Sequence, residues 1–255
     1  MVTQLHDLMA VLPAWFAGLL GGVVGLCIGS YLATVLSRWP RNLRTRDGRS
    51  RCDNCHVAIG PLHLVPIAGY VMARGRCRNC GSSIDPDHLI VEAICGVIGA
   101  ICGAAGVLLV APFLWLLAVL AMFDARYFWL PDRLVAATAG AALLVPSAAE
   151  WHLRILGGII GFAMLWIVAA AYRRIRGRVG LGGGDAKLFG AIGLWCGALN
   201  LPLVLLIASL LGLLDAAIRT ARGGDAATLR IPLGTHLSLA AAGLLLFQTA
   251  LNGSI

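Results

Sequence analysis

The feature that most constrains this chain is a series of apolar stretches long enough to cross a lipid bilayer. Residues 14–36 (AWFAGLLGGVVGLCIGSYLATVL) are apolar or small throughout, and about 20 such residues span roughly 30 Å of hydrocarbon. Residues 89–123 are almost wholly apolar but too long for one span, so we expect two short helices that turn near Gly106–Pro112. The sequence therefore predicts an all-α polytopic membrane protein.

Five further apolar stretches bring the expected number of spans to eight, at 133–150, 153–172, 186–199, 201–218 and 231–251. Asn200 and Pro202 mark the end of the short sixth span. Composition agrees, because 13% of the residues are charged, against about a quarter in soluble domains. The first stretch is not expected to be a cleaved signal peptide: no Lys or Arg precedes it, and it exceeds the roughly 7–15 residues of an h-region.

The basic residues predict the orientation of these spans. If the N-terminus is outside and all eight stretches cross, the inside segments are 37–88, 124–133, 173–187 and 219–230. These segments hold 19 of the 20 Lys and Arg residues, and only Arg154 is left outside. This distribution obeys the positive-inside rule. It explains the net charge of +8 as membrane topology with some attraction to anionic lipid, and not as a nucleic-acid site.

Residues 37–88 form a polar, arginine-rich insert that carries two C-x-x-C motifs, in RCDNC and RCRNCG. Four thiolates at this spacing are typical of a structural zinc site, with Cys52, Cys55, Cys77 and Cys80 as the ligands. The predicted cytoplasmic location disfavours structural disulfides. A redox role for one C-x-x-C is the alternative. The other four cysteines lie in apolar runs and are expected to be buried small hydrophobic residues, namely Cys27, Cys95, Cys102 and Cys196.

Carboxylates within a bilayer are costly, so each one is a functional candidate. The candidates are Glu92, Asp124, Asp132, Asp185 and Asp215. Asp124 and Asp185 both lie where an expected span meets the cytoplasm, on different helices. Two facing carboxylates can divide acid–base work, one staying protonated while the other activates water. The alternatives are that Asp185 caps a helix and that Asp124 pairs with Arg126 or Arg133.

Asp185 follows an unusual run of glycines in GLGGGDAKL (180–188). Glycine allows close backbone approach, so we expect an extended substrate backbone to lie against Gly182 and Gly184. A glycine-rich loop before a helix can also cradle phosphate. A nucleotide site is not favoured, because the sequence lacks G-x-x-x-x-G-K-[ST].

Taken together and in order, these motifs resemble the prepilin leader peptidases of type IV pilus and type II secretion systems, which are GxGD-type intramembrane aspartic proteases. The motifs are GSYLATVLSRWP (29–40), the paired cysteine motif, LIVEAICG (89–96), FDARYFWLPD (123–132), GLGGGDAKL and IPLGTHLSLAAAG (231–243). Three positions depart from the family pattern: Ala33 replaces an Asn, and Leu233 and Thr235 interrupt a motif that usually reads Pro-Phe-Gly-Pro.

The resemblance implies that Asp124 and Asp185 are catalytic and that Asp132 is not. It also implies that the enzyme cleaves the basic leader of prepilins or pseudopilins at the cytoplasmic face of the bacterial inner membrane. Members with the cysteine insert also methylate the new N-terminus from S-adenosylmethionine, and Gly75 matches a glycine linked to that activity. No Rossmann-type G-x-G-x-x-G is present. Asp215 matches no family motif and is expected to pair with Arg219 one turn later.

We therefore expect three parts: a first transmembrane helix at 1–36, a cytoplasmic zinc insert at 37–88, and a seven-helix peptidase core at 89–255. Both termini are predicted to be periplasmic. One rival function is a proton-coupled transporter that uses the intramembrane carboxylates as a relay. The other is a membrane-anchored zinc module that binds a partner without catalysis.

Overall fold

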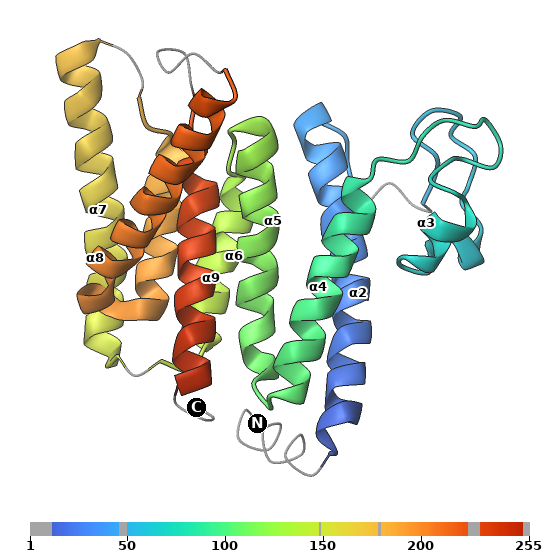
Figure 1. Cartoon of the computed structure of the whole chain (residues 1–255), viewed down its shortest axis with the longest axis horizontal. Coiled ribbons are helices and arrows are strands. Elements are labelled where there is room, and N and C mark those ends of the chain that lie inside the picture. Colours follow the sequence, from blue (N-terminus) through green and yellow to red (C-terminus); the bar gives the residue numbers. More distant parts are fainter. Residues whose placement is uncertain (1–11, 46–49, 148, 178–179, 224–229, 252–255) are drawn as a thin grey trace. The chain divides into compact units, whose positions relative to one another are not determined.

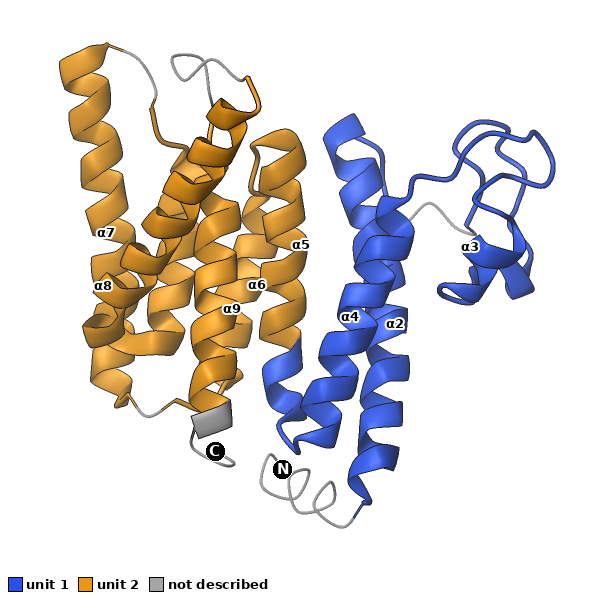
Figure 2. Ribbon diagram, in the orientation of Figure 1, with its two compact units in different colours: residues 1–111 blue, residues 112–255 orange. Residues whose placement is uncertain are grey.

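The computed structural model describes residues 12–45, 50–147, 149–177, 180–223 and 230–251. Arg46, Arg49 and Arg178, which contribute to the predicted topology, lie outside these ranges. The described residues are helical apart from turns, loops and two isolated bridges (Figure 1). The chain divides into two compact units, residues 1–111 and 112–255 (Figure 2).

Five helical segments among the described residues are long and apolar enough to cross a membrane. They are Ala14–Arg41, Asp87–Ala104, Leu108–Tyr127, Trp151–Arg176 and Gly183–Ala221, and Leu233–Thr249 is a shorter apolar helix. The predicted all-α, multi-pass class is thereby confirmed. The count of eight spans and the three-part division stay predictions.

Unit 1 is built on a pair of packed helices, α2 (Ala14–Arg38) and α4 (Asp87–Ala104). Glycines allow the close packing: a Cβ at Gly29 would lie 2.9 Å from both the Glu92 Cα and the Cys95 Cβ. Small residues of this kind let transmembrane helices approach each other. The remaining elements are η1 (Trp39–Arg41), η2 (Pro61–Leu64), α3 (Ala68–Met72) and η3 (Leu108–Val110).

Unit 2 contains α5 (Ala111–Tyr127) apart from its first residue, and also α6 (Asp132–Leu144), α7 (Trp151–Arg176), α8 (Gly183–Ala221) and α9 (Leu233–Leu251). Helix α6 ends before the predicted limit of 150. Pro146 disfavours helical geometry at the residue before it, and Val145 has extended backbone angles, φ −70° and ψ 128°.

Helix α8 folds back on itself at Gly197, whose φ of 73° and ψ of 170° are not helical. The predicted sixth and seventh spans are its two arms, but the break comes three residues before Asn200. The Asn200 side chain instead donates to the Cys196 carbonyl, over 2.9 Å. Because of this reversal, residues from the first and last turns of α8 both lie near the start of α9. A straight helix would separate Asp185 from Asp215 by about 45 Å.

Arg154, the one basic residue expected outside, is buried within unit 2. Its guanidinium donates to the carbonyls of Ala142 at 2.6 Å and Leu194 at 2.9 Å, and it lies over the Trp151 ring. Two of these contacts join the end of α6 to the first arm of α8. Arg154 therefore holds three helices together and pairs its own charge with backbone carbonyls.

Candidate active site and metal centre

The two aspartates singled out in the sequence come together within unit 2. Asp124 lies in the last turns of α5 and Asp185 in the first turn of α8, and their side chains are buried. The two carboxylates are close enough to interact electrostatically, and the Gly234 backbone amide lies near both. A carboxylate pair separated by 61 residues in the sequence is therefore assembled by three helices.

The beginning of α9 supplies the hydrogen bond to Asp124. The Thr235 backbone N–H donates to Asp124 Oδ2 over 2.8 Å. The Thr235 hydroxyl donates to the Ala121 carbonyl over 2.9 Å, which fixes the start of α9 against α5. Asp124 therefore accepts a backbone donor that the sequence motif alone did not reveal.

Asp185 has a different environment. Its Oδ1 is buried and has no hydrogen-bond partner among the described residues. The capping position of α8 belongs to Gly182, which makes no side-chain capping bond, and Asp185 is the third helical residue. The Gly182 backbone nevertheless lies against the Asp185 carboxylate, so Asp185 also contacts the N-terminal backbone of α8, as the capping alternative expects.

Leu130 fills the space between the starts of α8 and α9. A Cβ at Gly184 would lie 2.8 Å from the Leu130 Cβ, and one at Gly234 would lie 2.9 Å from its Cδ1. Gly182 is extended, and a Cβ there would lie 3.1 Å from Asp185 Oδ2. A Cβ added at Gly183, in contrast, would meet nothing within 4 Å. The glycines thus let α8 begin close to Leu130 and Asp124, while substrate approach at Gly182 and Gly184 stays a prediction.

Two other acidic residues of unit 2, Asp132 and Asp215, make ion pairs outside the dyad. Asp132 is exposed and pairs with Lys187 over 2.7 Å. Asp215 pairs with Arg219 over 2.7 Å, which confirms the predicted pairing one turn apart. In unit 1, buried Glu92 accepts the backbone N–H of Ile67 over 2.7 Å. It holds the insert onto α4, because Ile67 directly precedes α3.

Three residues at the start of α9 were not assigned roles from the sequence: Gly234, Thr235 and His236. His236 is buried and lies 3.8 Å from Asp215, measured between Nε2 and Oδ2. The sequence signal that could have pointed to them is the pair of adjacent polar residues, Thr235 and His236, at the start of an apolar stretch. Polar groups in such a stretch need hydrogen-bond partners. Their partners on α5 and α8 become visible only in the fold.

The four cysteines of the insert form a compact cluster in unit 1. Their sulfur atoms all lie within 4.8 Å of one another, with Cys52 and Cys80 3.8 Å apart and Cys55 and Cys77 3.9 Å apart. Tetrahedral zinc with Zn–S bonds of about 2.3 Å places its sulfur ligands roughly 3.8 Å apart. The donor set and its spacing therefore fit a four-coordinate metal ion.

Both cysteine pairs sit in the same local fold. In the first loop the Cys52 N–H donates to the Val57 carbonyl, and the Cys52 carbonyl accepts the His56 N–H. In the second loop the Cys77 N–H donates to the Ser82 carbonyl, and the Cys77 carbonyl accepts the Gly81 N–H. His56 and Gly81 have positive φ values of 58° and 72°. The two loops thus present their sulfurs in equivalent positions.

Polar neighbours favour the thiolate at Cys80. The Ser82 hydroxyl lies 3.1 Å from its sulfur and the Asn54 side chain donates to it over 3.7 Å. The hydrogen bonds from Ser82, followed by the one from Asn54, lower the pKa of Cys80 to about 6. A thiolate is the form that binds metal.

Gly75 occupies a turn that favours glycine. Its φ is 66°, and a Cβ would lie 3.0 Å from the Tyr70 hydroxyl oxygen. Its carbonyl accepts the Ile84 N–H over 2.8 Å. The turn brings the end of α3 to the second cysteine loop, so the shape of this part of the insert depends on Gly75.

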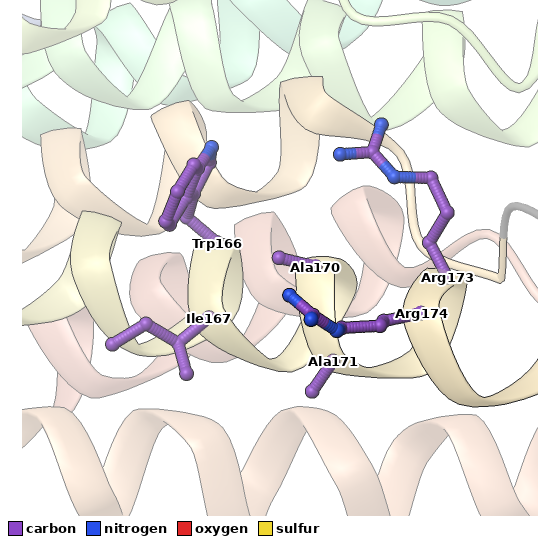
Figure 3. A pocket seen from close by; sticks show the side chains of 6 residues that line it. All are labelled: Trp166, Ile167, Ala170, Ala171, Arg173 and Arg174. Carbon is purple, nitrogen blue, oxygen red and sulfur yellow. The ribbon is translucent and has the colours of Figure 1, made fainter.

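The outer face of α7 bears a hollow of about 400 Å³ (Figure 3). All the residues that line it belong to α7 itself: Trp166, Ile167, Ala170, Ala171, Arg173 and Arg174. It contains neither aspartate of the dyad. An apolar hollow ending in two arginines suits the boundary between hydrocarbon and lipid headgroups.

Comparison with known proteins places these features in one family. The family model of the bacterial Peptidase A24 N-terminal domain matches residues 23–105, and that of the type IV leader peptidase family matches residues 111–216. The second match includes both aspartates and ends before α9. No solved structure matches this chain.

Several curated proteins are similar along most of their length. A prepilin leader peptidase/N-methyltransferase of Burkholderia pseudomallei is 30% identical, covering 94% of this chain and 88% of its own. One of Neisseria gonorrhoeae is 29% identical, covering 86% and 87%. A type 4 prepilin-like proteins leader peptide-processing enzyme of Escherichia coli is 30% identical, covering 92% and 96%. These matches confirm the predicted resemblance, and this chain belongs to the type IV leader peptidase family.

Proposed function

We propose that this protein is an intramembrane aspartic endopeptidase in which Asp124 and Asp185 hydrolyse the leader peptide of prepilins or pseudopilins. Family membership supports the peptidase activity, and the names of the relatives support a second, N-methyltransferase activity. The observation that carries the catalytic assignment is the convergence of two buried carboxylates beside the Gly234 amide.

The chemistry follows from this pairing. One carboxylate takes a proton from water, whose oxygen attacks the scissile carbonyl carbon, and the other carboxylic acid supplies a proton. Burial removes bulk water, so charges and hydrogen bonds act more strongly on the reacting atoms. Two carboxylates within one site suffice for this division of acid and base roles.

The dyad is proposed to lie at the cytoplasmic boundary of the inner membrane. Helices α7 and α8 pack antiparallel, since Gly161 faces Phe189 and Gly157 faces Gly193. The arginines at the end of α7 therefore lie at the same end of unit 2 as Asp185. By the positive-inside rule this end is cytoplasmic, with the cysteine insert inside and both termini periplasmic. A basic leader on that side would bring its scissile bond to the level of the aspartates.

The metal proposed for the insert is Zn²⁺, bound by Cys52, Cys55, Cys77 and Cys80. Four protein ligands leave no open coordination position, so the metal would stabilise the fold of the insert and take no part in hydrolysis. None of the apolar side chains in the described part of the insert is buried, which supports such a role, since small units without a core often need a metal to fold. Arg51, Arg76 and Arg78 are next to the cysteines in the sequence, and their positive charges would offset the negative charge of four thiolates around the metal.

The methyl donor is proposed to be S-adenosylmethionine, with Gly75 as the methylation-linked position. The name N-methyltransferase, carried by the similar proteins, supports this proposal. The close packing of Gly75 on Tyr70 supports a role for Gly75 in shaping the insert.

The two rival functions make different predictions. The relatives carry peptidase names and give no support to a proton-coupled transporter. A non-catalytic zinc module would keep its function without either aspartate but lose it with the cysteines.

Co-expression with a prepilin tests the proposal directly. The mass and N-terminal residue of the prepilin report cleavage and methylation together. Wild type should release the leader, and Asp124→Asn and Asp185→Asn should each leave full-length prepilin while remaining in the membrane. Cleavage at the wild-type rate in either variant would exclude the dyad.

A further inference from the structure

A pattern of large and small side chains forms the hollow on α7 (Figure 3). Residues three or four positions apart in a helix lie on the same face. Trp166 and Ile167 therefore lie one turn before Ala170. Arg173 and Arg174 lie one turn after it. The small side chains of Ala170 and the alanine that follows leave a space of about 400 Å³ between these larger groups. The hollow is thus one continuous surface that is apolar at one end and cationic at the other.

Helix α7 exposes more of its apolar length than the other four candidate spans among the described residues. In its apolar window 17% of the residues are buried, against 22–61% in the others. Trp166 and Ile167 are 54% and 58% exposed. In a bilayer an uncovered apolar helix face of this kind lies against the acyl chains of lipids. The apolar end of the hollow is therefore a surface that an acyl chain can occupy.

Arg173 and Arg174 give the other end of the hollow a positive charge. Helix α7 contains no acidic residue, and within the described residues no ion pair joins either arginine to a carboxylate. Helical side chains tilt toward the N-terminus of their helix, and Figure 3 shows both guanidinium groups turned back toward the Trp166 end of the hollow. Two cations are therefore directed toward an apolar surface, where an anion would stabilise them.

From this arrangement we propose that the hollow on α7 binds one anionic phospholipid. The headgroup phosphate pairs with Arg173 and Arg174, and an acyl chain lies over the alanines beside Trp166. Guanidinium groups suit phosphate because they offer paired N–H donors in a fixed geometry. The hollow contains neither Asp124 nor Asp185, so the inference does not depend on the proposed peptidase chemistry.

An anionic phospholipid matches both ends of the hollow, whereas other occupants match one end at most. A free phosphate ion would pair with the arginines but leave the surface beside Trp166 and Ile167 uncovered. A zwitterionic phospholipid would cover the apolar end but bring no net negative charge to the arginines. The basic leader of the proposed substrate would meet two positive charges, which disfavours it.

Native mass spectrometry of the detergent-solubilised full-length protein tests the arginines. Dioleoylphosphatidylglycerol should occupy one tight site, and dioleoylphosphatidylcholine, which has the same acyl chains but no net charge, should not. Arg173→Gln and Arg174→Gln should each weaken this site roughly fivefold, the contribution of one basic residue next to anionic lipid. Arg176→Gln is the matched control, because Arg176 is exposed in the same last turn but does not line the hollow. Equal weakening in all three variants, or equal binding of the two lipids, would overturn the proposal.

Ala171→Leu fills the hollow while both arginines stay in place. Ala171 is exposed, so the fold has room for a leucine there. Phosphatidylglycerol binding should weaken at least as much as after the loss of one arginine. Val168→Leu is the control, since Val168 is exposed on α7 outside the hollow. Unchanged lipid binding in Ala171→Leu contradicts the site. If the same variant instead disrupts a dimer, the face belongs to a second copy of the chain and the lipid proposal fails.

Fluorescence quenching locates the acyl chain. Phosphatidylglycerol with brominated chains should quench tryptophan emission of the wild type more than brominated phosphatidylcholine does. Trp166→Phe should remove this excess, and Trp15→Phe should retain it, because Trp15 is an exposed tryptophan on α2. Inorganic phosphate, compared with chloride at equal ionic strength, should leave the excess in place. An excess that survives in Trp166→Phe places the lipid elsewhere, and one that phosphate abolishes assigns the arginines to a free anion; either result rejects the proposal.

Discussion

Thr235 donates its backbone N–H to Oδ2 of Asp124 over 2.8 Å, although 111 positions separate the two residues. The bond joins the first turn of α9 to the last turns of α5 at the point where Asp185 enters from α8. A backbone donor of this kind is rigid and is worth more to a carboxylate than to a neutral acceptor. The start of α9 is therefore part of the proposed catalytic centre.

Thr235→Pro should weaken catalysis without unfolding α9. Proline lacks the N–H but is tolerated in a first helical turn, so cleavage should fall roughly tenfold, the value of one hydrogen bond to a charged group. Thr235→Val is the comparison variant: it keeps the N–H but removes the hydroxyl, which donates to the Ala121 carbonyl over 2.9 Å and to Asp124 Oδ2 over 3.4 Å. Its loss of activity should be smaller than that of Thr235→Pro. Steady-state cleavage of a prepilin measures both. Equal losses in the two variants would assign the effect to the hydroxyl.

Asp185→Asn should lower the cleavage rate by at least about a hundredfold, because a general acid or base contributes at least that much. Asp132→Asn is the matched control: it makes the same chemical change at an exposed aspartate paired with Lys187, and it should remain active. Mass spectrometry of co-expressed prepilin reports both variants. Loss of activity in both would point to general disruption of this end of unit 2.

Gly184→Ala should impair cleavage much more than Gly183→Ala, although the two glycines are adjacent. A Cβ at Gly184 would lie 2.8 Å from the Leu130 Cβ, whereas one at Gly183 meets nothing within 4 Å. Overpacking of this kind costs about 1–3 kcal/mol, which displaces the start of α8 from Asp124. Leu130→Gly, which removes the Cβ at 2.8 Å, should partly rescue Gly184→Ala. If it does not, substrate approach at Gly184 becomes the better explanation.

Purified protein should contain one zinc ion per chain, and Cys77→Ser should release it. Removal of one thiolate from a four-thiolate site leaves an incomplete ligand set, and the insert should become sensitive to limited proteolysis. Cys27→Ser is the control, since Cys27 lies on α2 outside the cluster; it is exposed, so the expectation that it is buried was wrong for this one of the four cysteines. Elemental analysis gives the metal content. Full zinc in Cys77→Ser, or an insert that stays protease-resistant after chelation, would contradict the structural zinc site.

Gly75→Ala should reduce methylation more than cleavage. The new Cβ would meet the Tyr70 ring, and a non-glycine residue at φ 66° costs about 1–2 kcal/mol. Gly81→Ala has the same backbone penalty at φ 72° with nothing within 4 Å, so it separates the Tyr70 contact from backbone strain. The N-terminal mass of processed prepilin gives the methylated fraction. Equal loss of methylation in both variants would exclude a specific role for the Gly75–Tyr70 contact.

The sequence by itself determined the membrane class, the cysteine cluster and the pairing of Asp215 with Arg219. These depend on local quantities: the length of apolar runs, the spacing of thiols within short loops and the one-turn periodicity of a helix. The family followed from the order of its motifs, and the comparisons confirmed it.

Only the tertiary structure decided how α8 is used and what surrounds each aspartate. The reversal at Gly197 brings Asp215 to the same end as Asp185, and it depends on a single backbone conformation within an apolar run. The Thr235 contact joins residues 111 positions apart, and the His236 contact joins α9 to the second arm of α8. The length of the apolar runs predicts which segments cross the membrane. It does not predict which helix ends meet, because lipid-facing and helix-facing residues are equally apolar.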